Sequence, residues 1–381
     1  MPSKYALTNA NVTTPTEAPI KFWTPDMTID NVLQALAVAN VMPIPSHLSW
    51  KPNGCPKKGT LKGGVLPLVN AIAPNCIGDD IGCGVLAVQT NLTEISEETL
   101  KHILTEARRI IATGRDRDNK VFWDGFKTVP PIEAITKEIK QAEKQFGTLG
   151  IGNHYVEIQQ GSDGYIWWVI HAGSRDMGSK ITNYYHNLAV SSGIVPERCE
   201  PLAYFSFSSD LGQEYYTAMN LCLEYARENR QVISRDIERI FRKFHNVHIT
   251  DTIDTPHNYA ESMTLVSGKE VILHRKEASA VAEEKCGVIS SFHQGEPSYI
   301  VRGSCNTDIA HSSPLKMSLT HANIIGIIND CSENMDWLNI AKDVGKFPFL
   351  ENINVTIDLA TILENQMNRV EVVTVLTSFD N

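Results

Sequence analysis

Ten residues in the first quarter of the chain combine groups that a purely structural segment would not need. The stretch Cys76–Val85 has the sequence CIGDDIGCGV, with two adjacent aspartates ahead of a cysteine and glycines around them. A tight turn needs glycines but no thiol, and a buried strand needs isoleucine and valine but no acids. An aspartate and a cysteine close together, as in Asp80 and Cys83, are candidate ligands for a transition metal, with Asp79 as the competing acid.

Three of the twelve histidines stand where an expected strand meets a glycine or proline turn. His154 follows the loop 150–153 (GIGN), His171 ends the run 165–170 (YIWWVI), and His257 follows a proline. Functional residues tend to collect in such loops. Taken singly, each histidine also fits a structural role, with its ring nitrogens hydrogen-bonded inside the core.

Taken together, these side chains supply one carboxylate, one thiolate and three imidazoles. A thiolate can bridge two metal ions, so the five groups can hold two ions and leave positions open for substrate oxygens. Two ions a few ångströms apart suit reactions at phosphorus. The ligand types permit zinc, manganese or iron and do not choose among them. The set is Asp80, Cys83, His154, His171 and His257.

The elements that must position these residues form a mixed pattern. Alternating and apolar runs predict strands beside His154 and His171, and short strand signals recur over 265–301. Ser96 is a candidate N-cap for a helix over 96–113 because two glutamates follow it. Helical spacing also occurs over 29–40, 131–146, 209–229, 234–244, 323–340 and 358–367.

The order of these elements indicates the fold class. Strands and helices do not alternate strictly, which argues against a doubly wound parallel sheet. We therefore predict an α+β fold (irregular α/β) in which mixed sheets are flanked by helices. Because the 381 residues contain no internal repeat and no Pro/Gly/Ser-rich linker, we expect a single catalytic domain over 1–381.

The bulk composition limits the class of protein. A net charge of -10 argues against a protein coated in nucleic acid, although a local basic groove is compatible with it because salt screens charges beyond about 10 Å. Three segments are basic and are either solvated faces or parts of such a groove. They are 51–62, 106–120 and 227–245.

The same composition predicts a location and a redox state. Residues 1–19 lack the pattern of a signal peptide, and no apolar run approaches the length of a membrane span. The eight cysteines form no CxxC pair. We expect a cytoplasmic protein with no membrane partner and with most thiols reduced and buried.

Several motifs, in this chain order, resemble the RtcB family of RNA ligases over residues 42–376. The principal ones are DIGCG (80–84), GTLGIGNHYVE (147–157), HAGSR (171–175) and HNYA (257–260). Three further segments are similar to family segments: YARENR (225–230), HRKEAS (274–279) and SYIVRG (298–303). Any one motif is weak evidence for the resemblance, but seven motifs in the family's order are specific evidence for it.

The resemblance implies an activity and a set of site residues. The family joins RNA ends that carry a 3'-phosphate or 2',3'-cyclic phosphate to ends that carry a 5'-hydroxyl, with GTP and manganese. It implies that the five residues above are ligands of two Mn²⁺ ions, with Cys83 shared. Implied nucleotide contacts are Asn153, Tyr155, Glu157, Asn258 and Ser298, and candidate RNA contacts are Arg175, Arg275 and Lys276.

The chain departs from the family around the nucleophile. The family nucleophile begins an H-G-A-G-R segment, which is matched here by His311 followed by Ser312 and Ser313. His311 is therefore the expected catalytic residue, to be linked to GMP, and the two serines are expected to offer groups to the nucleotide. The family also usually ends in Lys-Gly, whereas this chain ends in TSFDN (377–381).

Three hypotheses follow. The first is a GTP- and Mn-dependent RNA ligase in RNA repair or splicing, acting through a histidine–GMP intermediate. The alternative is a metal-dependent RNA-end phosphoesterase that has lost guanylyl transfer, motivated by the altered segment at His311 and the missing terminal lysine. The third is a non-catalytic nucleic-acid-binding protein, which the retention of all five ligand positions disfavours. The sequence identifies no protein activator and no physiological RNA.

Overall fold

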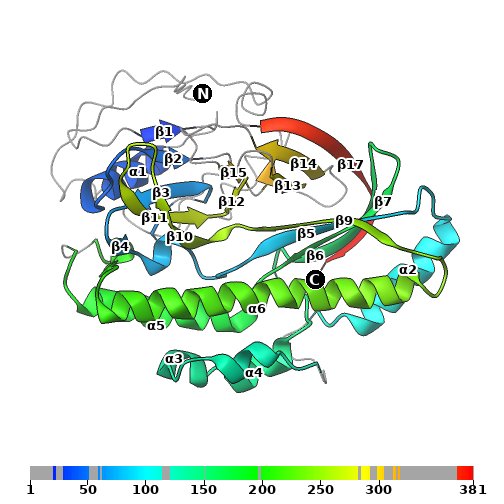
Figure 1. Ribbon diagram of the computed structural model, residues 1–381, viewed down its shortest axis with the longest axis horizontal. Helices are drawn as coiled ribbons and strands as arrows, with labels where there is room; N and C mark the ends of the chain where they lie inside the picture. Colours follow the sequence, from blue (N-terminus) through cyan, green and yellow to red (C-terminus); the bar gives the residue numbers. More distant parts are fainter. Residues whose placement is uncertain are drawn as a thin grey trace.

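The computed structural model describes most of the first 300 residues and a few later segments. The described residues are 20–22, 29–50, 59–60, 62–113, 121–150, 152–195, 199–281, 285–291, 298–303, 312–314, 316–317 and 367–380. Within them the chain has the predicted α+β class, with helices packed against antiparallel sheets (Figure 1). None of the helices in this part of the chain is long and apolar enough to cross a membrane.

The elements alternate irregularly along the chain. The α-helices are α1 (Ile29–Val41), α2 (Glu97–Ile110), α3 (Glu133–Thr136), α4 (Ile139–Gln145), α5 (Arg175–Ser191) and α6 (Asp210–Phe241). The strands up to the middle of the chain are β1 (Ile20–Phe22), β2 (Leu48–Trp50), β3 (Gly64–Leu68), β4 (Ala71–Ile72), β5 (Gly84–Thr90), β6 (Tyr155–Gly161), β7 (Ile166–Ala172) and β8 (Phe205–Ser206). The later strands are β9 (Ile249–Pro256), β10 (Asn258–Thr264), β11 (Glu270–Lys276), β12 (Ala278–Ala280), β13 (Cys286–Ser291), β14 (Ser298–Gly303), β15 (Ser312–Pro314), β16 (Lys316–Met317) and β17 (Met367–Asp380).

The larger sheet has eight strands in the order β16-β13-β14-β17-β6-β7-β5-β9. All of its pairs are antiparallel except β13 with β16. A second sheet of five strands, β1-β2-β3-β11-β10, lies beside it. The chain passes from one sheet to the other at His257, the single residue between β9 and β10.

Both faces of the larger sheet are covered, which explains the continuous apolar run of β7. Trp168 and Ile170 pack in a cluster with Ile233 and Ile237 of α6. The alternate residues Trp167 and Val169 pack in another cluster on the opposite face. Because side chains alternate along a strand, His171 faces the same side as Val169, away from α6.

Helix α6 is the longest element and runs beneath the larger sheet, with α5 beside it and with α3 and α4 below both in the view of Figure 1. Two separate helices, 209–229 and 234–244, were predicted here, and this was wrong. The residues between them contain neither proline nor glycine, and Val232, Ile233 and Ser234 are buried, so core packing continues the helix across the expected break.

Other predicted elements have mixed outcomes. The helix after Ser96 is confirmed, and the Ser96 side chain accepts a hydrogen bond from the Thr99 amide at 3.2 Å. The predicted helix over 131–146 is divided into α3 and α4. The predicted helix over 323–340 lies outside the described residues, and that over 358–367 meets them only at Met367, where β17 begins.

The buried His274 of β11 predicts a pH-dependent stability. Its Nε2 accepts the Ala73 amide at 3.0 Å, its Nδ1 lies 3.0 Å from the Ile272 carbonyl, and burial lowers its pKa from 6.5 to about 4. The unfolded chain therefore binds this proton below pH 6.5, whereas the folded chain excludes it down to about pH 4. Between pH 7 and pH 5 we expect this histidine to remove about 2 kcal/mol of stability.

Urea denaturation of the wild type and of His274→Gln at both pH values measures this contribution. Glutamine keeps an acceptor for the Ala73 amide but does not titrate. The variant should lose about 2 kcal/mol less than the wild type on acidification. Equal losses in the two proteins would contradict the assignment.

Candidate metal centre

Four adjacent strands of the larger sheet, β6-β7-β5-β9, bring the sequence-predicted metal ligands together. The antiparallel registers pair His171 with Val85 and with Tyr155, and pair Gly84 with Pro256. Cys83, His154 and His257 are the residues directly next to these paired positions. The ligands therefore collect at one end of the four strands because strand pairing fixes where each segment stops.

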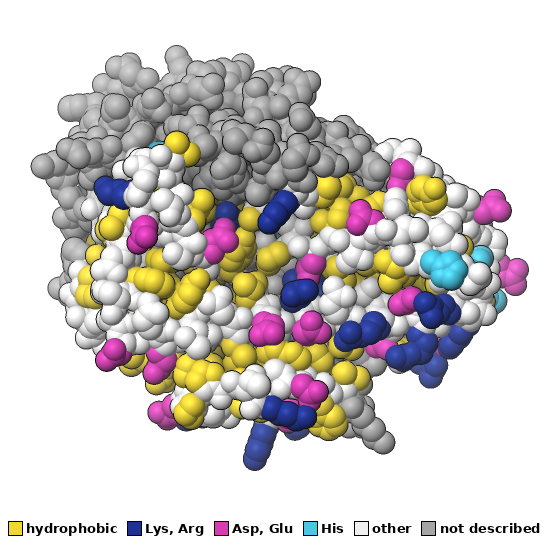
Figure 2. All heavy atoms as spheres, in the orientation of Figure 1, with side chains coloured by type: hydrophobic (Ala, Val, Ile, Leu, Met, Phe, Trp, Pro, Cys, Tyr) yellow, Lys and Arg dark blue, Asp and Glu magenta, His cyan; other side chains and the backbone are white. Residues whose placement is uncertain are grey.

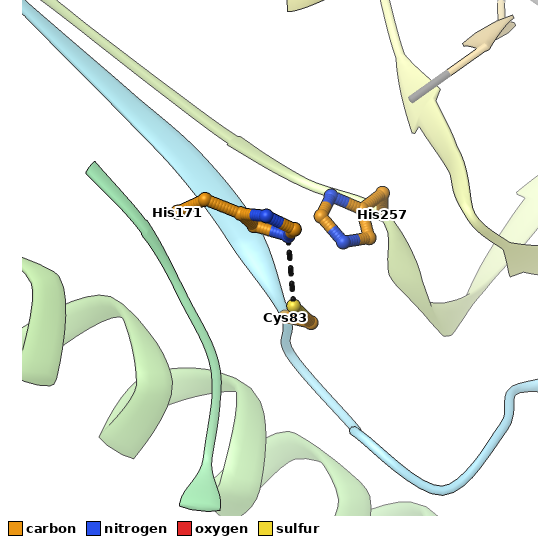
Figure 3. Close-up of side chains that lie close together, drawn as sticks. All are labelled: Cys83, His171 and His257. Atoms are coloured by element: carbon orange, nitrogen blue, oxygen red, sulfur yellow. Dashed lines mark hydrogen bonds between the residues drawn. The ribbon is translucent and has the colours of Figure 1, made fainter. Parts of the chain in front are cut away.

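The Cys83 thiol lies at the centre of the group. Its sulfur is 3.3 Å from His154 Nε2 and 3.2 Å from His171 Nε2. Figure 3 shows Cys83, His171 and His257 pointing toward one another. Two sets of possible ligand atoms, each within 4.8 Å of one another, both contain Cys83: one with His171 and His257, the other with Asp80 and His154. This sharing is the arrangement that a bridging thiolate requires.

Asp80, rather than Asp79, is the acid that reaches this centre. Its Oδ2 is 3.0 Å from His154 Nε2, while Asp79 is exposed. Asp80 Oδ1 is buried and has no hydrogen-bond partner among the described residues. A side chain at Gly173 would overlap the Asp80 carboxylate, so the glycine of HAGSR provides the space that this acid occupies.

The outward nitrogens of two histidines are held by backbone carbonyls. His154 Nδ1 lies 3.0 Å from the Leu149 carbonyl, and His171 Nδ1 lies 3.0 Å from the Asn153 carbonyl. Carbonyls only accept hydrogen bonds, so in the neutral rings both Nδ1 atoms carry the proton and both Nε2 lone pairs face Cys83. Such outer hydrogen bonds are typical of metal-bound histidines.

The donor set therefore fits a cation. Two imidazole lone pairs and a carboxylate converge on one thiol, which has at most one proton to share among them. The unpartnered Asp80 Oδ1 adds a further buried acceptor. Cations would satisfy this excess of acceptors, with the ligand types that transition metals accept.

Burial and neighbouring charges shift the pKa values of Cys83 and Asp80. Burial, followed by the charge of Asp80, raises the pKa of the Cys83 thiol well above its usual value, and Arg230 opposes this. Burial would also raise the pKa of Asp80, but the neighbouring His154, Cys83 and Arg175 side chains hold it below its usual value. Without a cation the site thus holds an ionised Asp80 beside a protonated thiol, and binding a metal must release the thiol proton.

The predicted nucleotide residues have different surroundings in the structure. Gln159 donates to Glu157 and, at 3.2 Å, to Ser298 Oγ, and so links β6 to β14 across the sheet. Tyr155 is buried and its ring packs against His171 at 5.5 Å. Asn153 is exposed.

Asn258, the remaining predicted nucleotide residue among those with described side chains, joins two parts of the site. Its Nδ2 donates to the Asp80 carbonyl at 3.0 Å, and its Oδ1 accepts the Glu277 amide at 2.8 Å. Glu277 has a φ of 50°, which is rare for a non-glycine residue, and its carboxylate pairs with Lys62 at 2.6 Å. The sequence analysis quoted Glu277 only as part of the HRKEAS segment and predicted no role for it.

The three predicted RNA contacts have different surroundings in the structure. Arg175 has a φ of 60° and places its Nη1 3.4 Å from His154 Nδ1, so it borders the metal centre. Arg275 is buried and donates to Glu261 and to the Tyr259 hydroxyl. Lys276 is buried and donates to the Asn75 carbonyl at 3.1 Å. An RNA contact through Arg275 or Lys276 stays a prediction and would require these bonds to break.

The expected nucleophile His311 lies outside the described residues, but the strand that follows it can be traced. Ser312 and Ser313 begin β15, which pairs with β12 so that Ser313 is opposite Ser279. The Ala278 amide of β12 donates to the His257 carbonyl at 3.1 Å. The backbone after position 311 therefore runs beside a strand bonded to a candidate ligand.

Comparisons with known proteins agree with this site. The family model described as tRNA-splicing ligase RtcB matches residues 34–129 and 124–315. The RNA-splicing ligase RtcB of Escherichia coli K12 is 26% identical over 412 residues, which cover 96% of this chain and 97% of the relative. The tRNA-splicing ligase RtcB of Methanococcus maripaludis is 28% identical over 273 residues, 56% of each chain. The chain therefore belongs to the RtcB family.

Proposed function

We propose that this protein is an RNA ligase that joins 3'-phosphate or 2',3'-cyclic-phosphate ends to 5'-hydroxyl ends, using GTP and two Mn²⁺ ions. The observation that carries the proposal is the Cys83 thiol shared between two groups of candidate ligands. The names of the relatives as RNA-splicing and tRNA-splicing ligases support the reaction class. Because the ligands span residues 80–257 of one strand-paired unit, we also infer a single catalytic domain.

The five candidate ligands would hold the ions, which supply charge stabilisation for phosphoryl oxygens when bound. His311 is proposed to attack the α-phosphorus of GTP, forming an N–P bond while pyrophosphate leaves. Imidazole suits this role, because it is a nucleophile near neutral pH and a good leaving group once bonded to phosphorus. A 2',3'-cyclic end would first be opened by water to a 3'-phosphate. GMP then passes to the RNA 3'-phosphate as the N–P bond breaks, and the attack of the 5'-hydroxyl on that end releases GMP.

Two regions are proposed to contact the RNA backbone: the buried Arg175 beside the metal centre, and exposed cations on α6 and just after it. Arg175 borders the metal centre and would face the ends to be joined. The C-terminal half of α6 and the two residues that follow it carry exposed cations, and Figure 2 shows Lys and Arg side chains gathered where α6 ends near α2. Several of these cations are paired with acids. We therefore expect them to bind the RNA backbone with moderate affinity that falls as the salt concentration rises. They are Arg227, Arg235, Arg239, Arg242 and Lys243.

Incubation with α-labelled GTP and Mn²⁺ tests the nucleotide chemistry. The wild type should form an acid-labile, base-stable adduct, as expected for a phosphoramidate, and His311→Ala should abolish it. His248→Ala is the matched control because His248 is exposed and lies outside the metal centre. An adduct that persists in His311→Ala would refute the assignment of the nucleophile, and labelling by ATP instead would refute guanine selectivity.

The alternative is a metal-dependent RNA-end phosphoesterase. It is favoured by the residues that follow His311, where Ser312 and Pro314 replace the glycines expected of the family. The same experiment separates the two functions. Loss of the RNA 3'-phosphate without any nucleotide adduct would identify the phosphoesterase.

A further inference from the structure

Two neighbouring side chains of α6, Asn229 and Arg230, contact every segment that carries a histidine or cysteine of the metal centre. Both are fully buried. The sequence marks them only as the end of the YARENR segment, to which no role could be given. They lie on the opposite face of the sheet from His171, so they reach the ligand segments through their backbones.

Arg230 binds the backbone on either side of the shared thiol. Its Nη1 donates to the Gly82 carbonyl and to the Ala172 carbonyl, both at 2.9 Å. Gly82 directly precedes Cys83, and Ala172 directly follows His171. A Cβ at Gly84 would lie 2.9 Å from the guanidinium carbon, so this glycine lets the arginine approach the sheet.

Arg230 also reaches the strand that leads to His257. Its Nε and Nη2 both lie 2.8 Å from Asp254 Oδ1, and Asp254 stands three residues before His257 on β9. The planar guanidinium therefore makes fixed hydrogen bonds to three ligand-bearing segments at once.

Asn229 holds the remaining segment. Its Oδ1 accepts the Gly147 amide at 2.7 Å, and its Nδ2 donates to the Thr148 carbonyl at 3.0 Å. These residues lead into Leu149, whose carbonyl orients His154. Asn229 Nδ2 also lies 3.3 Å from the carbonyl of Gly173, the glycine that faces Asp80.

We propose that Asn229 and Arg230 are positioning residues of the metal centre, which set the relative places of Cys83, His154, His171 and His257 from behind the sheet. The inference rests on the proposed metal centre. Strand pairing aligns β6, β7, β5 and β9, and the His257 amide donates to the Cys83 carbonyl at 2.9 Å, but the ligands at residues 83, 154 and 257 lie just beyond the strand ends. The two α6 side chains supply bonds at that boundary, and binding sites depend on such support for their geometry.

Titration with Co²⁺ tests this inference without using catalysis. A thiolate bound to Co²⁺ gives a charge-transfer absorption, and the d–d bands report the ligand geometry. The variants are Asn229→Ala, which removes its three bonds, and Arg230→Lys, which keeps the charge but cannot reproduce the fork of donors. Tyr225→Phe is the matched control, because it lies on the same helix, is buried, and loses one hydrogen bond to the Ala142 carbonyl.

We expect both variants to bind Co²⁺ at least about tenfold more weakly than the wild type, with shifted d–d bands. Tyr225→Phe should keep the wild-type affinity and spectrum. Folded variants that match the wild type in both readouts would overturn the positioning role, and Asn229→Ala alone decides if Arg230→Lys does not fold. Absence of a cobalt–thiolate band in the wild type would instead overturn the proposed metal centre, and this inference with it.

Discussion

Replacement of Cys83 by alanine should abolish cation binding at both halves of the metal centre and reduce RNA joining below detection. The thiol is the only group shared by the two candidate ligand sets among the described residues. Loss of an outer hydrogen-bond partner of a metal ligand already costs about 10- to 100-fold in affinity or activity. Loss of the shared ligand itself should lower affinity and activity by more than this factor.

Isothermal titration of Mn²⁺ into the purified protein, followed by a ligation assay, measures this effect. The matched control is Cys199→Ala, which removes a buried thiol in a different core cluster. The control should retain binding, and both variants should remain folded. Two Mn²⁺ ions bound to Cys83→Ala with wild-type affinity would show that the thiol is not a ligand.

The second large effect concerns stability. We expect Gly82→Ala to lower the free energy of unfolding by about 3 kcal/mol, as the sum of a strained backbone and an overpacked contact. Gly82 has a φ of +74°, and a Cβ there would lie 2.8 Å from Leu223 Cα and 3.0 Å from Ala226 Cβ of α6. The helix backbone cannot move away cheaply, because α6 packs against β7, β5 and β9 of the larger sheet and against β10.

Gly268→Ala separates the two contributions. Gly268 has a similar φ of +79°, but a Cβ there would meet no atom within 4 Å. It should therefore lose only about 1 kcal/mol, the cost of the left-handed backbone alone. Urea denaturation of both variants gives the comparison. Equal losses would mean that the contact between the DIGCG turn and α6 contributes nothing.

Local sequence patterns were enough to predict those elements whose ends are set by nearby residues. Ser96 and the glutamates after it start α2 wherever the helix packs, because a cap bonds only its own first turn. The prediction of a helix break near residue 230 was wrong because the outcome there depended on residues that are distant in the sequence. Burial of Ile233 against the larger sheet and of Val232 in a second core cluster continues α6, and no local pattern records what lies across the core.

The sequence by itself determined the types of the candidate ligands, the α+β class and the family. Each follows from residue identity and order, which need no coordinates. Only the tertiary structure decided that Arg275 and Lys276 have buried partners, and that Asn229 and Arg230 lie behind the ligands. These outcomes depend on strand register and on packing between residues up to 201 positions apart, as for Lys276 and Asn75, which local composition does not encode.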